Sequence, residues 1–216
     1  MVTTNHNYIN TFPVKDTDTS LILGTIHPHD RDAFKIDFFY GNQNSIWKIL
    51  ASALPDINFD SKELIVSALS NSNIWISDMI SSCDREDKKV TQDRLLENIK
   101  LNDTEIKNGI LKSKISEIFF TSGFGKNNAA KLFCDKFSIK AELNDKREFD
   151  IPESKFGRKI KGIVLFSPSG QANIGISQNK LYLELKEHYN GCARPVNQFK
   201  IDFYREAFKK QFNKLK

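Results

Sequence analysis

Short apolar runs alternate with longer segments in which apolar residues recur at intervals of three or four. The apolar runs indicate buried β-strands because each is brief and is followed by polar residues. They lie at residues 21–23, 74–76, 117–120 and 162–166. Short strands separated by helices are typical of a parallel sheet that helices cover on both faces. The pattern therefore predicts an α/β fold.

Helical spacing of apolar residues identifies the predicted helices. They lie at residues 46–54, 62–69, 126–137, 178–189 and 199–213. Residues 79–114 are ambiguous, and residues 140–161 are expected to form an irregular polar excursion. Residues 1–19, rich in Thr, Asn and Asp, are predicted to be a flexible leader, and residues 20–216 to be a single domain.

Length and composition agree with a globular domain. A chain of 216 residues with 39% hydrophobic residues and 17 Phe can bury a core without disulfide bonds or a metal. Cys83, Cys134 and Cys192 are too few for a disulfide framework or a four-thiolate iron–sulfur cluster. No apolar run approaches the roughly 18 residues of a membrane span, and residues 1–20 have no apolar signal-peptide core. We therefore expect a reduced, cytoplasmic protein with no membrane partner.

Charge is unevenly divided between the two halves of the chain. Residues 1–108 carry 11 Lys and Arg against 16 Asp and Glu, a balance of −5, whereas residues 109–216 carry 21 against 11, a balance of +10. A basic half beside an acidic half favours a surface that faces a polyanion. A solvated surface without a partner would give the same count.

Polar loops follow three of the predicted strands and are the candidates for a functional site. They lie at residues 24–30, 121–123 and 167–173. Because the carboxyl ends of parallel strands share one edge of a sheet, we expect these loops to converge on one pocket. No Walker-type loop and no spacing typical of a Ser-His-Asp or Cys-His site occurs. The run His27-Pro28-His29-Asp30 has no recognised zinc spacing, so no metal is expected there.

Four segments carry a more specific signal through their residues and their order. They are Gly24-Thr25-Ile26-His27-Pro28, the stretch from Phe38-Phe39-Tyr40 to Asn44-Ser45-Ile46-Trp47, Ile74-Trp75-Ile76-Ser77-Asp78 with Cys83-Asp84-Arg85, and Leu165-Phe166-Ser167-Pro168-Ser169-Gly170. Together they resemble the motifs of the uracil-DNA glycosylase superfamily, in particular a small bacterial branch related to mismatch-specific and hypoxanthine-type glycosylases. The resemblance covers roughly residues 20–212.

The resemblance implies a three-layer α/β/α sandwich with a four-stranded parallel sheet in the order 2-1-3-4. It also implies a monomeric DNA N-glycosylase, a hydrolase that acts without a cofactor or a metal. Such an enzyme flips a base out of lesion-containing DNA and stacks it on an aromatic ring. Hydrogen-bond donors then stabilise charge on the departing base while a water is positioned at C1′. The expected base is uracil, hypoxanthine or a modified pyrimidine.

Two catalytic candidates follow from the resemblance. His27 stands where relatives place the Asn or Asp that positions the attacking water. A neutral imidazole can accept a proton from water and an imidazolium can stabilise the leaving base; the alternative is a site whose chemistry is lost or altered. Asn44 aligns with the Asn of hypoxanthine-type relatives and can supply the catalytic amide, or it can simply cap the following helix.

The residues assigned to base binding lie near the ends of the predicted strands. Tyr40, or Phe39 beside it, is the candidate ring for stacking, with core packing as the alternative for Phe39. Ser122 is expected to read the base edge, unless it belongs to a plain turn. Gly24 and Thr25 of the first loop complete this set.

The residues assigned to DNA binding lie mainly in the last loop. Its serines are expected to pinch the DNA backbone, since small residues let backbone N–H groups approach phosphates. Its end is expected to fill the gap that the flipped base leaves. The alternative is a Pro-containing turn with capping serines. The set consists of Ser167, Ser169, Gly170, Gln171, Asn173 and Lys180.

Two other functions remain open at the level of the sequence. One is a catalytically impaired DNA-binding module that keeps the fold and the lesion pocket. The other is a nucleotide- or nucleoside-processing enzyme that uses the Pro-Ser-Gly loop to bind phosphate. A duplex binder loses affinity steeply as salt rises, whereas a small-nucleotide enzyme does not.

Overall fold

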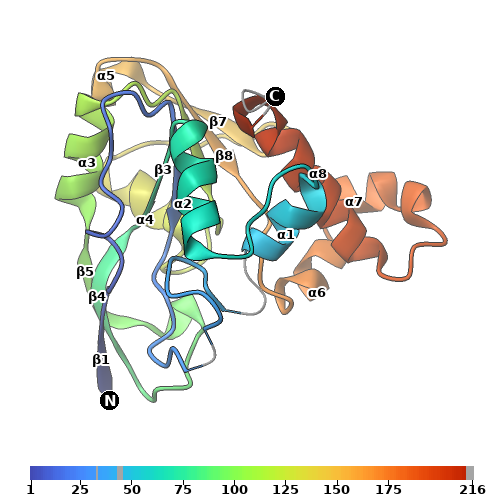
Figure 1. The fold of residues 1–216 in the computed structure, drawn as a ribbon, viewed down its shortest axis with the longest axis horizontal. Helices are drawn as coiled ribbons and strands as arrows, with labels where there is room; N and C mark the ends of the chain where they lie inside the picture. Colours follow the sequence, from blue (N-terminus) through green and yellow to red (C-terminus); the bar gives the residue numbers. More distant parts are fainter. Residues whose placement is uncertain (33, 43–45, 213–216) are drawn as a thin grey trace.

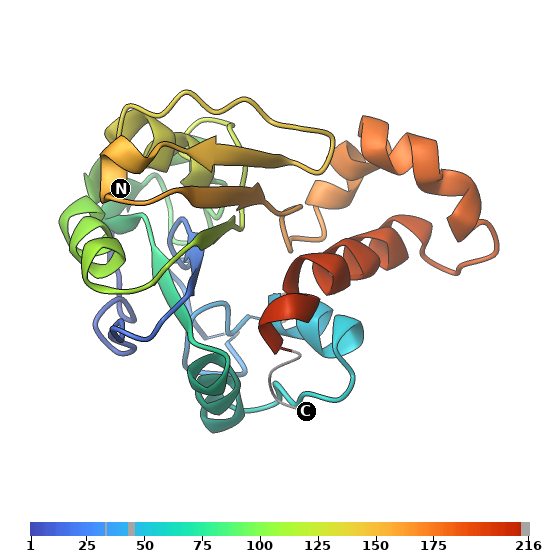
Figure 2. The ribbon, with the colours of Figure 1, turned by 90° about the horizontal axis from the view of Figure 1, so that it is seen from above.

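A five-stranded sheet forms the centre of the molecule (Figures 1 and 2). The computed structural model describes residues 1–32, 34–42 and 46–212. Along the sheet the strands are β3 (Ile74–Asp78), β2 (Ser20–Gly24), β6 (Glu117–Phe120), β8 (Ile160–Val164) and β7 (Glu148–Ile151). The first four are parallel to one another, and β7 pairs antiparallel with β8 at the edge.

The α/β class is confirmed, but the sheet has five strands in the order β3-β2-β6-β8-β7 and is not the expected four-stranded sheet. Its four parallel strands, numbered among themselves along the chain, follow the expected order 2-1-3-4. The additional strand, β7, lies in the segment that was expected to be irregular. It buries Phe149 and Ile151 and exposes Asp150 between them, as a strand with one buried face does. This alternation of buried and exposed residues is short, and polar and basic residues lie on either side of it, so the sequence pattern does not reveal the strand.

Helices cover both faces of this sheet. On β6, Phe119 stacks on Phe208 with ring centroids 4.4 Å apart, while Phe120 contacts Phe133 at 5.2 Å. Successive residues of a strand point to opposite faces. Consequently α8 (Pro195–Phe212), which carries Phe208, and α4 (Ala129–Lys136), which carries Phe133, lie on opposite sides of the sheet, as Figure 2 shows. The arrangement is compatible with a three-layer α/β fold.

The other helices are short and surround this centre. They are α1 (Ile46–Ala53), α2 (Lys62–Asn71), α3 (Asp103–Lys112), α5 (Glu153–Phe156), α6 (Ala172–Ser177) and α7 (Lys180–Leu185), with the 3₁₀ turns η1 (Asp93–Leu95) and η2 (Lys186–Tyr189). The predicted helices α1, α2, α4 and α8 are confirmed, and the one predicted at residues 178–189 is divided into α7 and η2. None of the helices in the described part of the chain has the length and apolar character that a membrane span requires.

A second, antiparallel sheet includes the N-terminal residues. Its order is β1 (Val2–Asn5), β4 (Ile80–Arg85) and β5 (Glu97–Leu101). The expectation of a flexible leader is therefore corrected, because β1 pairs with β4 and the side chains of Tyr8 and Phe12 are buried. Isolated aromatic residues hold this segment in place, so it lacks the apolar run by which a buried strand is recognised.

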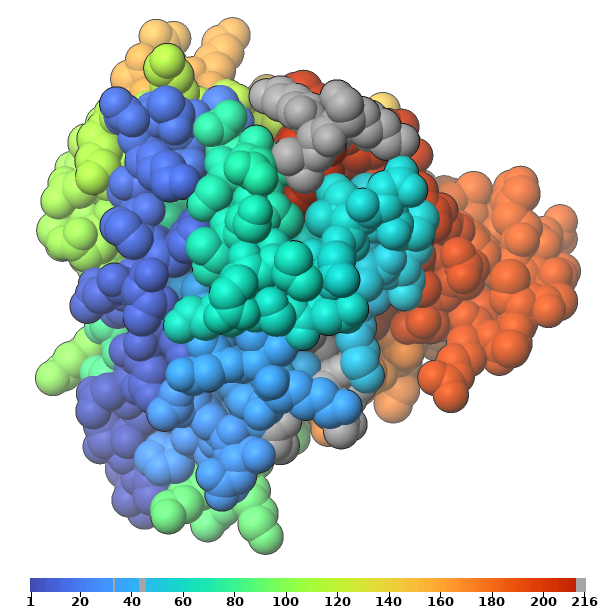
Figure 3. All heavy atoms as spheres, in the orientation of Figure 1, coloured from blue at the N-terminus to red at the C-terminus, as the bar shows by residue number. Residues whose placement is uncertain are grey.

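The helices α6, α7 and η2 form a lobe that projects away from the sheet (orange in Figures 1 and 3). A small cluster of Phe166, Ile176 and Phe199 joins the lobe to α8 and to the start of the loop after β8. On the surface of α6, Ile174 is 79% exposed.

Candidate functional site

A cleft of about 720 Å³ opens at the carboxyl ends of the parallel strands. The loops after β2, β6 and β8 all contribute to its walls, as predicted from the sequence. The residues that matter most for its chemistry are Thr25, Tyr40, Asp93, Ser122, Ser167 and Ser169. Its volume lies within the range of about 300–1,000 Å³ that is typical of ligand sites.

Gly24, the last residue of β2, makes space for two side chains beside the cleft. A Cβ atom at this position would lie 1.7 Å from the Tyr40 hydroxyl oxygen and 2.2 Å from Oδ1 of Asp78. Any larger residue would displace both groups. Gly24, which was predicted to bind the base, is not among the residues that line the cleft, and the structure gives it the role of permitting this close approach.

Asp78, at the end of β3, is held by donors from two distant segments. Nδ1 of His6 accepts hydrogen bonds from the backbone N–H groups of residues 8 and 9, so Nε2 carries the proton and donates to Oδ2 of Asp78 at 2.7 Å. The Tyr40 hydroxyl donates to Oδ1 at 3.4 Å and lies 2.9 Å from Oγ1 of Thr121. Both carboxylate oxygens of Asp78 are thus engaged within the protein.

Tyr40 lines the cleft in a fixed position. Its backbone φ of 55° lies in the left-handed region, which is costly for a bulky side chain. The hydrogen bonds of its hydroxyl offset that cost and fix the ring. Burial, with a contribution from the charge of Asp78, raises the pKa of Tyr40 well above its usual value, so the hydroxyl remains a neutral donor.

Phe39 is a core residue, and the assignment of this ring to base stacking is corrected. It is only 1% exposed and packs against the rings of Phe38 and Tyr8, with centroid distances of 5.2 and 5.7 Å. Its backbone carbonyl accepts a hydrogen bond from Nε1 of Trp47. Of the two neighbouring aromatic residues, Tyr40 is the one that faces the cleft.

Asp93, in η1, ends a chain of hydrogen bonds that has a definite direction. The backbone N–H of Ala129 donates to Oγ of Ser122 at 2.8 Å, and this oxygen lies 3.1 Å from Oγ1 of Thr25. The Thr25 hydroxyl donates to Oδ2 of Asp93 at 2.9 Å. Because each hydroxyl has one proton, Ser122 donates to Thr25. Two of the predicted base-binding residues therefore position a carboxyl group in the cleft.

The environment of Asp93 favours its protonated form. Burial raises its pKa from 3.8 to about 6, and the charge of Asp78 adds to the rise, while the hydrogen bond from Thr25 and the charge of Arg85 oppose it. The buried Arg85 guanidinium donates to a hydroxyl and to two backbone carbonyls, not to Asp93. A carboxyl whose pKa is this near neutrality can give and take a proton under ordinary conditions.

His27 lines the cleft, but both of its ring nitrogens are engaged within the protein. Nε2 accepts from the backbone N–H of Asn7 at 3.1 Å, and Nδ1 donates to the carbonyl of Pro28 at 2.6 Å. Burial lowers the pKa of His27, which favours this neutral tautomer. No lone pair is left to accept a proton from water, so the geometry does not favour the predicted catalytic role and gives His27 a structural one.

The second predicted catalytic residue, Asn44, lies outside the described residues. Asn42, two residues before it, is described and lines the cleft.

The loop after β8 brings only part of the predicted DNA-binding set to the cleft. Ser167, Ser169 and Gln171 line it. Asn173 is half-buried on α6 with its side-chain oxygen unpartnered. Lys180 extends into solvent on α7, 3.6 Å from Glu184. Gly170, between the lining residues, is exposed with open space around it.

Three residues near the cleft were not assigned a role from the sequence: His6, Asp78 and Asp93. His6 belongs to the supposed leader, and Asp93 to the segment whose pattern was ambiguous. Asp78 alone offered a usable signal, since it lies two residues after a predicted strand whose carboxyl end shares the edge of the sheet with the three loops.

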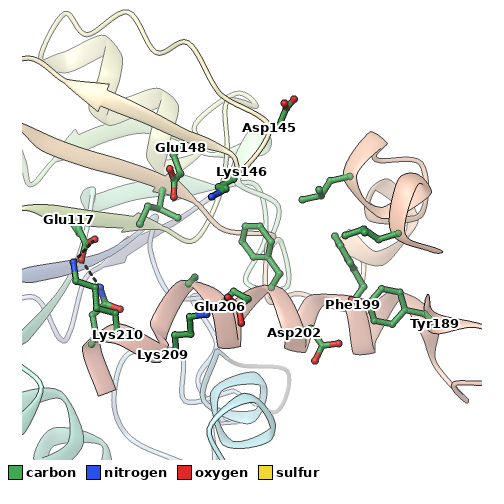
Figure 4. A pocket seen from close by; sticks show the side chains of 16 residues that line it. Glu117, Asp145, Lys146, Glu148, Tyr189, Phe199, Asp202, Glu206, Lys209 and Lys210 are labelled. Carbon is green, nitrogen blue, oxygen red and sulfur yellow. Dashed lines mark hydrogen bonds and ion pairs between the residues drawn. The ribbon is translucent and has the colours of Figure 1, made fainter. Parts of the chain in front are cut away.

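A second cavity, of about 520 Å³, lies between α8 and the edge of the sheet at β7 and β8 (Figure 4). Its apolar lining includes Ile163 and Phe199. Charged groups along its rim pair with one another, as Lys210 does with Glu117 at 3.5 Å. None of the three strand-end loops reaches this groove. The cleft at the strand ends is therefore the better candidate for chemistry.

Within the described ranges, no three His, Cys, Asp or Glu side chains are placed to hold a metal ion. His29, near His27 in sequence, lies instead with Nδ1 3.1 Å from the hydroxyl of Thr4. Comparison of the chain with protein-family models, with curated proteins and with solved structures gives no match in any of the three.

Proposed function

We propose that this protein is a DNA glycosylase-like hydrolase that flips a damaged or modified base out of DNA and cleaves its N-glycosidic bond. The observation that carries the proposal is the convergence of three strand-end loops, with hydroxyl and carboxyl groups, on one cleft. Two of these loops, those after β2 and β8, belong to the segments that resemble uracil-DNA glycosylase motifs, and that resemblance also supports the proposal. Uracil, hypoxanthine and a modified pyrimidine are the candidate bases.

The lining of the cleft suits the recognition of a flipped base. Enzymes that act on extruded bases read their edges by hydrogen bonds and stack them on aromatic side chains. Thr25 and Ser122 supply hydroxyl oxygens that can each accept one more hydrogen bond, since their protons are already donated within the protein. The fixed ring of Tyr40 supplies the stacking surface. On the basis of the resemblance, we assign to Asn44 the role of positioning the attacking water, because both ring nitrogens of His27 already form hydrogen bonds within the protein.

The rim of the cleft suits a DNA backbone. Lys126 and Arg94 line it and can neutralise phosphates. Ser167 and Ser169 can bind phosphates through hydroxyl and backbone N–H groups. Ile174, exposed just beyond this loop, is an apolar side chain of the kind that inserts between base steps and kinks a duplex.

The decisive experiment is release of free base from duplexes that each carry one lesion. Uracil, hypoxanthine and modified-pyrimidine duplexes are incubated with the protein, and abasic sites are revealed by strand breakage in alkali. The proposal expects cleavage at the lesion in at least one duplex and none in the matched undamaged duplex. Absence of product from every duplex contradicts it.

A catalytically impaired binding module of the same fold is the second candidate, favoured by the engagement of both His27 nitrogens. This module would bind lesion duplexes without releasing base. Its affinity would fall steeply between 50 and 200 mM salt, as expected for a protein that neutralises several phosphates. A small-nucleotide enzyme would show neither base release nor that salt dependence.

A further inference from the structure

Asp93 has one carboxyl oxygen held by the protein and one left for a ligand. Oδ2 accepts the hydrogen bond from Thr25, whereas Oδ1 forms none with any residue that the structure describes. The residue lines the cleft and is only partly exposed. Oδ1 is therefore available to a base that enters the cleft, and the Ser122–Thr25 chain fixes where it lies.

The other titratable groups beside the cleft are not free to transfer a proton. Both oxygens of Asp78 and both nitrogens of His27 accept or donate hydrogen bonds within the protein. Burial raises the pKa of Tyr40, and also that of Cys83, a buried residue of β4 that does not line the cleft, so both stay neutral near pH 7. Asp93 differs from these groups, because its Oδ1 makes no hydrogen bond with any residue that the structure describes.

Charged groups face Asp93 from several elements. Burial has the largest effect on its pKa and raises it to about 6; Arg85 of β4 opposes that rise, and Asp78 of β3 adds to it. Two further cations, Arg94 and Lys126, line the same cleft. A phosphate bound by these cations would bring negative charge toward the carboxyl group and so favour its protonated form.

The geometry points to Asp93 as a catalytic acid that protonates the departing base, an inference that rests on the proposed function. The C1′–N bond breaks and its electron pair passes into the base. The proton of the Asp93 carboxyl moves from Oδ1 to a ring nitrogen or carbonyl oxygen of that base. Water forms the new C1′–O bond and releases one proton to solvent, and solvent reprotonates Asp93 after the base leaves.

The test is a set of single-turnover base-release rates between pH 5 and pH 8.5 on the lesion duplex that wild type cleaves best. Three variants are compared with wild type: Asp93→Asn, Thr25→Val and Asp87→Asn. An Asn at position 93 can still accept from Thr25, so the hydrogen-bonded chain is kept. Asp87 is exposed in the turn between β4 and β5, and Asp87→Asn is therefore the matched control.

Wild type and Asp87→Asn should lose rate as pH rises through about 6. Asp93→Asn should be slower by about 100-fold or more at low pH, the usual contribution of a general acid, and its rate should lack that dependence. Thr25→Val removes a hydrogen bond that lowers the pKa of Asp93, so its fall should occur at higher pH.

The results distinguish a failure of the proposed function from a failure of the role proposed for Asp93. If wild type releases base and Asp93→Asn keeps both its rate and its pH profile, Asp93 is not the acid and the proposed function stands. If wild type releases no base from any duplex at any pH, the proposed function and the role of Asp93 are both wrong.

Discussion

His6 donates a hydrogen bond of 2.7 Å to the carboxylate of Asp78, which lies 72 residues further along the chain. Their side chains are 0% and 5% exposed. The bond joins the segment after β1 to the end of β3, and therefore links the smaller sheet to the cleft. The N-terminal segment, polar in sequence, is a structural part of the candidate site.

Replacing His6 by Ala should destabilise the protein by about 1–3 kcal/mol, the cost of leaving a buried acceptor without its donor. The free energy of unfolding from urea titration measures this directly. His188→Ala, at an exposed position in η2, is the control and should leave stability nearly unchanged. Equal stability of wild type and His6→Ala would show that the bond to Asp78 contributes nothing.

Gly24→Ala should disrupt the cleft, because the added methyl group would collide with the Tyr40 hydroxyl and the Asp78 carboxylate. We expect a lower melting temperature and loss of base release. Gly175→Ala is the matched control, since a Cβ at that position of α6 has no neighbour within 4 Å. Wild-type activity in Gly24→Ala would mean that Tyr40 and Asp78 can separate without harm.

Asp93→Asn should stabilise the protein at high pH and not at low pH. Below pH 3.8 the carboxyl is protonated in both the folded and the unfolded state, so its burial carries no charge penalty. Between pH 3.8 and about 6 the unfolded chain loses this proton while the folded protein keeps it, so the free energy of unfolding falls. Above about 6 the folded protein holds a buried ion, and the cost levels off at about 3 kcal/mol at most. The substitution removes that cost. Melting temperatures of the two proteins should diverge between about pH 4 and pH 6 and keep that difference up to pH 8, and a difference that does not change between pH 4 and pH 6 would contradict the raised pKa.

Ile174→Ala should reduce base release from duplex DNA about tenfold or more while leaving release from single-stranded DNA nearly unchanged. Only the duplex needs an apolar wedge to compensate for the stacking lost on flipping, which is worth a few kcal/mol per step. Leu111→Ala, at an exposed position of α3, is the control. Equal losses on both substrates would assign Ile174 to folding or to general binding.

The parallel strands and their polar loops could be predicted from the sequence because both depend on local pattern. A run such as Leu21-Ile22-Leu23 is buried wherever its sheet lies, and parallel strands bring their carboxyl ends to one edge. By contrast, β1 forms its backbone pairs with β4, as Val2 does with Arg85. A local pattern in the sequence cannot predict a pairing partner 83 positions away.

The roles of individual side chains depended on contacts that the sequence does not display. His27 occupies the expected position, yet the N–H of Asn7 engages its free nitrogen. Asp93 has no distinctive sequence context, and its chemistry arises from burial beside Thr25. Tyr40 and Phe39 are adjacent aromatic residues, and only the fold shows which of them faces the cleft.

The central claim is that a nucleobase enters the cleft at the strand ends. Photo-crosslinking tests it most directly, with a duplex that carries one 4-thiouracil at the lesion position and mass spectrometry of the attached peptides. We expect crosslinks within residues 25–28, 121–126 and 167–171, the segments that contribute most of the lining from the three loops. Crosslinks confined to α8 and β7, beside the groove of Figure 4, would contradict the account.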